Sequence, residues 1–153
     1  MGVRIQKVLD KGGNLTEILM DQEDYVEEIK EAEFNRDLKD DVLLGTEDHR
    51  TYRGIVGSLL WTVSMMRRDI LFDVASIAGA TNAPKIADMK REAKVITRAK
   101  RSKVVLRFRK MEGEVQLIVF CDAAWGKSDS GKTVGGIFLA LATTNPQGGN
   151  EQF

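Results

Sequence analysis

Apolar residues near the start of the chain fall in two short runs in which they alternate with polar ones. Val3 and Ile5 belong to the first run, Leu15 and Ile18 to the second, and the turn 11–14 (KGGN) lies between them. A glycine-rich turn between two such runs predicts a β-hairpin. Because a two-stranded hairpin is marginal by itself, we expect it to be the edge of a sheet that continues upstream.

The spacing of apolar residues then changes to three and four, which predicts α-helices. We expect them over residues 21–33, 46–66, 69–80 and 85–101. Thr46 is the expected N-cap of the second helix, because its hydroxyl can accept a hydrogen bond from a free N–H of the first turn. The polar stretch 35–46 predicts a linker, and Pro84 separates the third helix from the fourth.

Alternation with a period of two returns toward the C-terminus. It predicts strands over 103–108, 114–122 and 135–142, which we expect to form an antiparallel three-stranded sheet with exposed edges. The last residues (TTNPQGGNEQF) indicate a loop. The expected fold class is therefore α+β, with three parts along the chain: 1–45, 46–102 and 103–153.

Composition fits a globular chain: 42% of the 153 residues are hydrophobic and 30% are charged. No apolar run approaches the ~20 residues that a membrane helix needs, and no signal peptide or myristoylation pattern begins the chain. We expect an intracellular, unlipidated protein that is not secreted and has no membrane partner. The single cysteine (Cys121) and the single histidine (His49) exclude an internal disulfide and a zinc cluster.

Charge is balanced overall but unevenly placed. Residues 84–110 carry 11 bases and 2 acids, a net charge of +9, whereas residues 1–50 carry 14 acids and 7 bases. The bases of the predicted helix 85–101 on its polar face are Lys90, Arg91, Lys94, Arg98 and Arg101. They are candidates for binding nucleic acid phosphates, and a solvated basic face is an equally good interpretation.

Residues 126–133 (GKSDSGKT) fit the phosphate-loop pattern G-x-x-x-x-G-K-[ST]. Such a loop follows a strand closely and opens a long helix whose N–H groups face the phosphates. Here Gly135 and Gly136 stand where the first helical turn would be, at a cost of roughly 1 kcal/mol each. Only 20 residues follow Thr133, too few for a parallel sheet with its crossovers. A turn between two antiparallel strands is the favoured interpretation, and nucleotide binding is the lesser one.

Several segments, in order along the chain, resemble the Ty1/copia type of retrotransposon reverse transcriptase–ribonuclease H polyprotein. The matching segments are 21–29 (DQEDYVEEI), 52–61 (YRGIVGSLLW), 67–74 (RRDILFDV), 93–96 (AKVI), 117–125 (LIVFCDAAW) and 128–141 (SDSGKTVGGIFLAL). In the third segment Arg68 stands where the family has proline, so we expect a less rigid break between the two helices that meet there.

The resemblance implies that residues 1–45 end the reverse transcriptase, 46–102 form a helical connection and 103–153 begin a ribonuclease H-like sheet. It implies that Asp122 is the first metal-binding carboxylate of a site that cleaves the RNA of an RNA–DNA hybrid with two Mg²⁺ ions. The family's other carboxylates would lie outside this chain. We therefore expect a truncated piece that is inactive alone, binds Mg²⁺ unstably at best and works with the remainder of the Pol polyprotein.

The remaining candidates favour structural interpretations. Trp125 and Cys121 are expected to pack beside Asp122 or in the core, Asp129 to be a solvated turn residue and His49 to lie on the surface. Three functions stay open: a piece of a retrotransposon Pol protein, a small nucleic-acid-binding module that uses residues 85–110, and, least favoured, a nucleotide-binding loop at 126–133.

Overall fold

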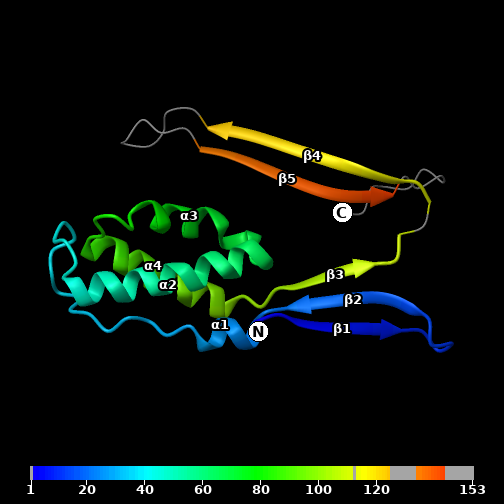
Figure 1. The fold of residues 1–153 in the computed structure, drawn as a ribbon, viewed down its shortest axis with the longest axis horizontal. Coiled ribbons are helices and arrows are strands. Elements are labelled where there is room, and N and C mark those ends of the chain that lie inside the picture. Colours follow the sequence, from blue (N-terminus) through cyan, green and yellow to red (C-terminus); the bar gives the residue numbers. More distant parts are fainter. Residues whose placement is uncertain (1, 112, 125–133, 144–153) are drawn as a thin grey trace. The chain divides into compact units, whose positions relative to one another are not determined.

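The computed structural model describes residues 2–111, 113–124 and 134–143 and divides the chain into two compact units, residues 1–108 and 109–153. The described residues form helices and two small sheets, which confirms the expected α+β class (Figure 1).

The predicted N-terminal hairpin is present in the first unit. Strands β1 (Arg4–Leu9) and β2 (Leu15–Asp21) pair in antiparallel register. Asp10 organises the turn between them, because its carboxylate accepts hydrogen bonds from the backbone N–H groups of Gly12 (2.8 Å) and Asn14 (2.9 Å). Gly13 has a φ of 81°, a conformation that favours glycine.

The expected three-stranded C-terminal sheet is wrong in one respect. Strand β3 (Val105–Arg109), which corresponds to its first predicted strand, pairs with β2 of the N-terminal hairpin instead (Figure 1). The reason lies in the helices. Helix α4 packs against α1, and α1 directly follows β2. The segment that leaves the end of α4 therefore lies beside β2, where it forms β3. Ion pairs between Lys103 and Glu23 and between Arg107 and Glu17 (3.7 Å) link these segments.

The helices follow the predicted pattern with different ends. They are α1 (Glu23–Glu28), α2 (Thr46–Met65), α3 (Leu71–Gly79), preceded by the 3₁₀ turn Arg68–Ile70, and α4 (Ile86–Arg101). The first is shorter than expected, because Ile29 is already extended (ψ 111°). The N-cap of α2 is Gly45 rather than the expected Thr46, and no side chain caps its free N–H groups.

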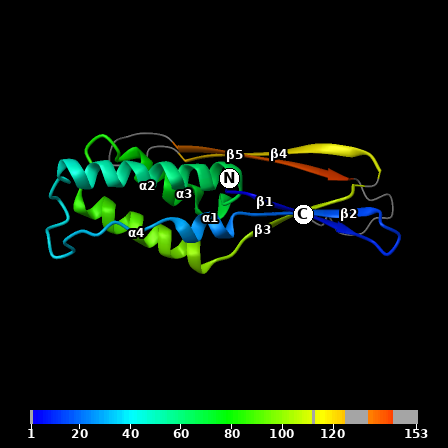
Figure 2. The ribbon, with the colours of Figure 1, turned by 60° about the horizontal axis from the view of Figure 1, so that its bottom comes forward.

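The core of the first unit is made mainly by residues of α1, α2, α3 and α4. Figures 1 and 2 show how these helices are arranged. Its fully buried side chains include Tyr52, Leu59, Ile70, Ile77 and Ile96. The Tyr52 hydroxyl donates a 2.6 Å hydrogen bond to the carbonyl oxygen of Ile77, which joins α2 to the last turn of α3. Burial raises the pKa of the Tyr52 phenol well above its ordinary value.

The long connector 29–45 runs back along the helices and is fastened to the start of α4. Leu44 donates to the carbonyl oxygen of Pro84, and the N–H groups of Ile86 and Ala87 donate to the carbonyl oxygens of Val42 and Asp40. The connector is therefore held close to the polar face of α4.

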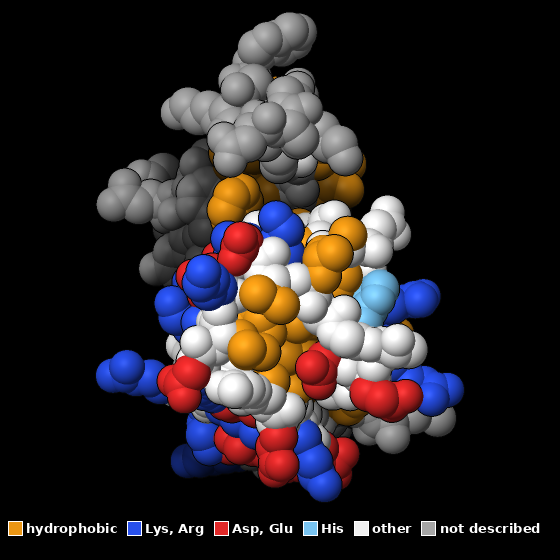
Figure 3. Space-filling model, turned by 90° about the vertical axis from the view of Figure 1, so that its left-hand side faces the viewer, with side chains coloured by type: hydrophobic (Ala, Val, Ile, Leu, Met, Phe, Trp, Pro, Cys, Tyr) orange, Lys and Arg blue, Asp and Glu red, His pale blue; other side chains and the backbone are white. Residues whose placement is uncertain are grey.

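Figure 3 views the end of the unit where α2 begins and shows exposed apolar side chains beside acidic and basic ones.

The second unit contains a single described hairpin, β4 (Val115–Ala124) paired with β5 (Val134–Thr143) in antiparallel register. Apolar side chains point to both faces, because Leu117 and Leu139 lie on one face and Phe120 and Phe138 on the other, each at least half exposed. Cys121 is exposed as well, so its expected core position is wrong.

Candidate nucleic-acid interface

Helix α4 has one buried face and one strongly basic face. Its buried residues include Ile86, Met89, Val95 and Ile96. The bases that remain outside recur every three or four residues, which is the spacing that places side chains on one side of a helix. The last turn contains Arg98, Lys100 and Arg101, where positive charge is favourable beside the free carbonyl groups of the helix end.

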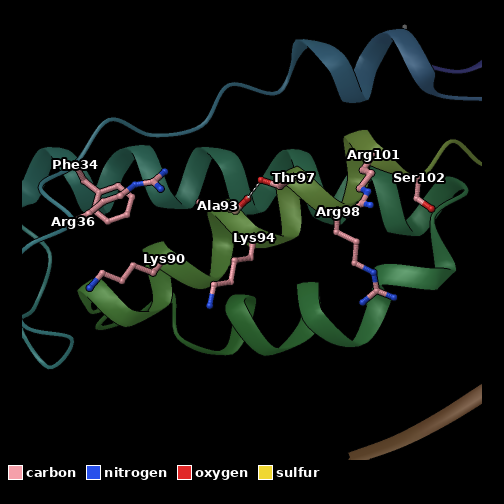
Figure 4. Close-up of a pocket in the computed structure, with 9 residues that line it drawn as sticks. All are labelled: Phe34, Arg36, Lys90, Ala93, Lys94, Thr97, Arg98, Arg101 and Ser102. Atoms are coloured by element: carbon pink, nitrogen blue, oxygen red, sulfur yellow. Dashed lines mark hydrogen bonds between the residues drawn. The ribbon is translucent and has the colours of Figure 1, made fainter.

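Four of the five predicted nucleic-acid-binding residues line one groove of about 690 Å³. Its cationic side chains are Arg36, Lys90, Lys94, Arg98 and Arg101. Phe34, Ala93, Thr97 and Ser102 supply the rest of its surface. In Figure 4, the side chains of Lys90, Lys94 and Arg98 follow one another along α4, with Phe34 and Arg36 near the Lys90 end.

The residues that line the groove differ from the predicted set at two positions. Arg36 was missed because it comes from the connector, and its guanidinium lies 5.6 Å from the centre of the Phe34 ring in a cation–π contact. Arg91 does not line the groove; it contacts Ser76 at 3.4 Å and Asp88 at 3.8 Å. Only the folded position of the connector brings Arg36 to this site, so periodicity within α4 could not reveal it.

Three of the groove cations already have acidic partners. Lys90 lies 2.8 Å from Asp40, and Arg98 lies 2.8 Å from Asp73. Arg36 lies 3.5 Å from Glu31. Lys94 and Arg101 make no ion pair or side-chain hydrogen bond with the described part of the chain, and both are exposed. These two cations are available to an anionic ligand without displacing an acid.

In comparisons with protein-family models, curated proteins and solved structures, the chain gave no match. No helix among the described residues is long and apolar enough to cross a membrane. The site is therefore interpreted from its own chemistry.

Asp122 lies on β4 opposite Gly136, and its side chain is exposed. Across residues 2–111, 113–124 and 134–143, no three histidine, cysteine or acidic side chains gather in a way that could hold a metal ion. Two hard divalent ions need several oxygen ligands, so Asp122 alone does not fit a magnesium site. We derive no metal chemistry from it, and its role as a ligand stays a prediction.

The phosphate-loop residues 126–133 lie outside the described part of the chain, as do Trp125 and Asp129. The flanking residues are informative, because Val134–Thr143 form strand β5 and not the helix that a phosphate loop requires. β4 and β5 pair antiparallel on either side of the motif, which is the geometry of the predicted hairpin. Nucleotide binding therefore gains no support from the neighbouring elements.

His49 has a structural contact. Its Nε2 lies 2.7 Å from the carbonyl oxygen of Thr81, and because a carbonyl only accepts, the ring donates this hydrogen bond. The bond joins the first turns of α2 to the segment after α3, and the side chain is partly buried rather than fully on the surface. A histidine engaged in this way has no evident role as a base.

Proposed function

We propose that this chain is a piece of a Ty1/copia-type retrotransposon Pol protein, an RNA-directed DNA polymerase and ribonuclease H, and that it contributes nucleic-acid contacts rather than chemistry. The observation that carries the proposal is the α4 groove, in which Lys90, Lys94, Arg98 and Arg101 lie along one side of a helix with Arg36 beside them. A basic groove of this kind is a typical electrostatic footprint for phosphate contacts.

The groove favours contacts to the backbone of nucleic acid over contacts to bases. Reading base edges requires a helix or strand that enters a duplex groove, whereas these cations line a hollow between α4 and the connector. Phe34, the one aromatic side chain among the described residues that line the groove, is partly buried and already in contact with Arg36. Binding is therefore expected to be independent of sequence and sensitive to salt.

The exposed apolar surfaces support a role as part of a larger assembly. Ile5 and Phe108 on the first sheet are 62% and 50% exposed, and Ile137 on β5 is 74% exposed. Large apolar side chains exposed on a sheet mark a protein contact when they gather into a patch. The remainder of a Pol polyprotein, in an intracellular compartment, is the partner that this proposal implies.

Binding of an RNA–DNA hybrid by the full chain tests the proposal. We expect binding that weakens as salt rises, measured by fluorescence anisotropy, and that is lost in the double variant Lys94→Glu plus Arg98→Glu. The matched control is Arg50→Glu plus Arg53→Glu, which reverses two exposed charges of α2 outside the groove. Binding that responds equally to both double variants would count against the groove.

The second candidate, a small nucleic-acid-binding module that acts by itself through residues 85–110, uses the same groove. The two candidates differ in the role of the exposed apolar surfaces. A module that acts by itself needs no other protein to cover them. Specific capture of a separate Pol segment by the purified chain would favour the first candidate.

A further inference from the structure

The groove cations divide into two classes by their partners. Lys94 and Arg101 have no acidic partner within the described residues, and seven positions along a helix place them about 10 Å apart on one side. Lys90 and Arg98 are each 2.8 Å from a carboxylate, of Asp40 in the connector and of Asp73 in α3. Paired and unpaired cations therefore alternate along the helix: Lys90, Lys94, Arg98, Arg101.

The cations form one row, in a hollow, along a helix that is packed on its other side. A duplex presents two backbones separated by grooves about 6 Å and 12 Å wide. A single row of charges within a groove matches one backbone, which is what a single strand presents. Proteins that bind single strands without sequence preference combine a positively charged groove that tracks the backbone with aromatic side chains that stack on bases, and the α4 groove supplies the first of these.

On the basis of the function proposed above, we propose that the α4 groove binds the sugar–phosphate backbone of single-stranded nucleic acid through Lys94 and Arg101. Asp40 and Asp73 compete with that backbone for Lys90 and Arg98, and thereby limit the affinity. The two acids come from different elements, the connector and α3, so the competition depends on the folded arrangement and not on α4 alone.

The proposal makes a numerical statement about salt dependence. For single strands, the slope of log K against log salt is about −0.7 for each cation that contacts a phosphate. Contacts by Lys94 and Arg101 alone give a slope of about −1.4. Release of Lys90 and Arg98 from their acids adds two contacts and takes the slope to about −2.8.

The experiment measures anisotropy of a labelled single-stranded oligonucleotide with the full chain over a series of salt concentrations. The same sequence as a DNA duplex and as an RNA–DNA hybrid, and a polyglutamate of matched charge, serve as competitors. Three double variants accompany the wild type: Lys94→Glu plus Arg101→Glu, Asp40→Asn plus Asp73→Asn, and the control Asp37→Asn plus Asp41→Asn. The control removes two exposed acids of the same connector that pair with no groove cation in the described part.

We expect the single strand to compete best, the lysine–arginine variant to lose binding at least tenfold, and the Asp40–Asp73 variant to bind at least tenfold more tightly with a steeper slope. The control should change neither. Circular dichroism of each variant shows whether its helices are retained. A further variant, Lys94→Gln plus Arg101→Gln, removes the same positive charges without adding negative ones, so it separates the two effects.

The outcomes separate this inference from the function on which it rests. Groove-dependent binding of the hybrid that equals or exceeds that of the single strand overturns the single-strand inference and leaves the proposed function standing. No change in the Asp40–Asp73 variant overturns the competition by the acids. Equal competition by polyglutamate overturns the assignment to nucleic acid, and absence of any polyanion binding overturns both proposals.

Discussion

Arg67 donates a 2.6 Å hydrogen bond from Nη1 to the carbonyl oxygen of Ala99, and this bond ties the break between α2 and α3 to the last turn of α4. The same guanidinium makes two 2.8 Å bonds to the carboxylate of Asp69, which hold the pKa of that carboxyl below its ordinary value. Arg67 is only 3% exposed. It stabilises the break between α2 and α3.

Arg67→Ala is expected to lower the free energy of unfolding by about 2–3 kcal/mol, because it leaves the Ala99 carbonyl and the partly buried Asp69 without their partner. Arg67→Lys should recover part of this loss, since an ammonium cannot reproduce the two-pronged contact. Urea unfolding followed by circular dichroism measures both. Arg68→Ala is the control, and it should fall within about 0.5 kcal/mol of wild type because the Arg68 side chain is exposed and donates an exposed hydrogen bond to the carbonyl oxygen of Ser64. Equal losses at the two positions would contradict the role given to Arg67.

Glu92 provides a prediction about pH. It is 1% exposed in the core, its Oε1 has no hydrogen-bond partner among the described residues, and burial raises its pKa from 4.5 to about 8. The folded state therefore binds this proton between about pH 4.5 and 8 while the unfolded state releases it. By linkage, the contribution is fully present below pH 4.5 and is lost as pH rises to about 8, at a total cost of a few kcal/mol.

Glu92→Gln removes the titration and keeps the shape of the side chain. Between about pH 4.5 and 8 the difference in unfolding free energy should shift steadily in favour of the variant, and well above pH 8 the difference between the two proteins should stay constant. The control is Glu33→Gln, an exposed acid of the connector, which should follow the wild-type profile. A pH-independent difference between Glu92→Gln and wild type would show that this carboxyl titrates in its ordinary range.

Much of the fold follows from local pattern, and the exceptions have physical causes. The hairpin and α2, α3 and α4 were predictable because glycine-rich turns and apolar spacing of three and four are local properties. The partner of β3 was not, because pairing with β2 depends on the packing of α4 against α1.

The site shows the same division between local and tertiary information. Lys90, Lys94 and Arg98 share one side of α4 by spacing alone, whereas Arg36, Asp40 and Asp73 reach the groove from the connector and α3. Glu92 carried a signal that could have been used: it lies three residues after Met89 and four before Ile96, and thus on the buried stripe. Its charged side chain made a solvated position the natural expectation.

The β4–β5 hairpin is expected to make the chain self-associate. Val119 and Leu139 are cross-strand partners on an apolar face and are 51% and 61% exposed, and no proline or lysine occurs in either strand to protect its edge. Val119→Lys plus Leu139→Glu places an opposite-charge pair at that register position, which keeps the strands paired while removing apolar surface. Light scattering during size-exclusion chromatography should show a smaller average mass for the variant than for wild type or for Arg53→Glu. An unchanged mass would mean that this face does not drive association.

The last prediction concerns catalysis at Asp122. Because two Mg²⁺ ions need several carboxylates and none gather around Asp122 in the described residues, the purified chain should not cleave the RNA of an RNA–DNA hybrid in the presence of Mg²⁺. The assay is gel electrophoresis of end-labelled hybrid RNA, with Asp122→Asn as the paired variant, and wild type and Asp122→Asn should be equally inactive. A separate measurement of nucleotide binding tests the phosphate-loop motif. In that measurement Lys132→Ala should leave binding unchanged at its background level. Magnesium-dependent cleavage that disappears in Asp122→Asn would show that further ligands complete the site, and nucleotide binding that disappears in Lys132→Ala would restore the phosphate-loop hypothesis.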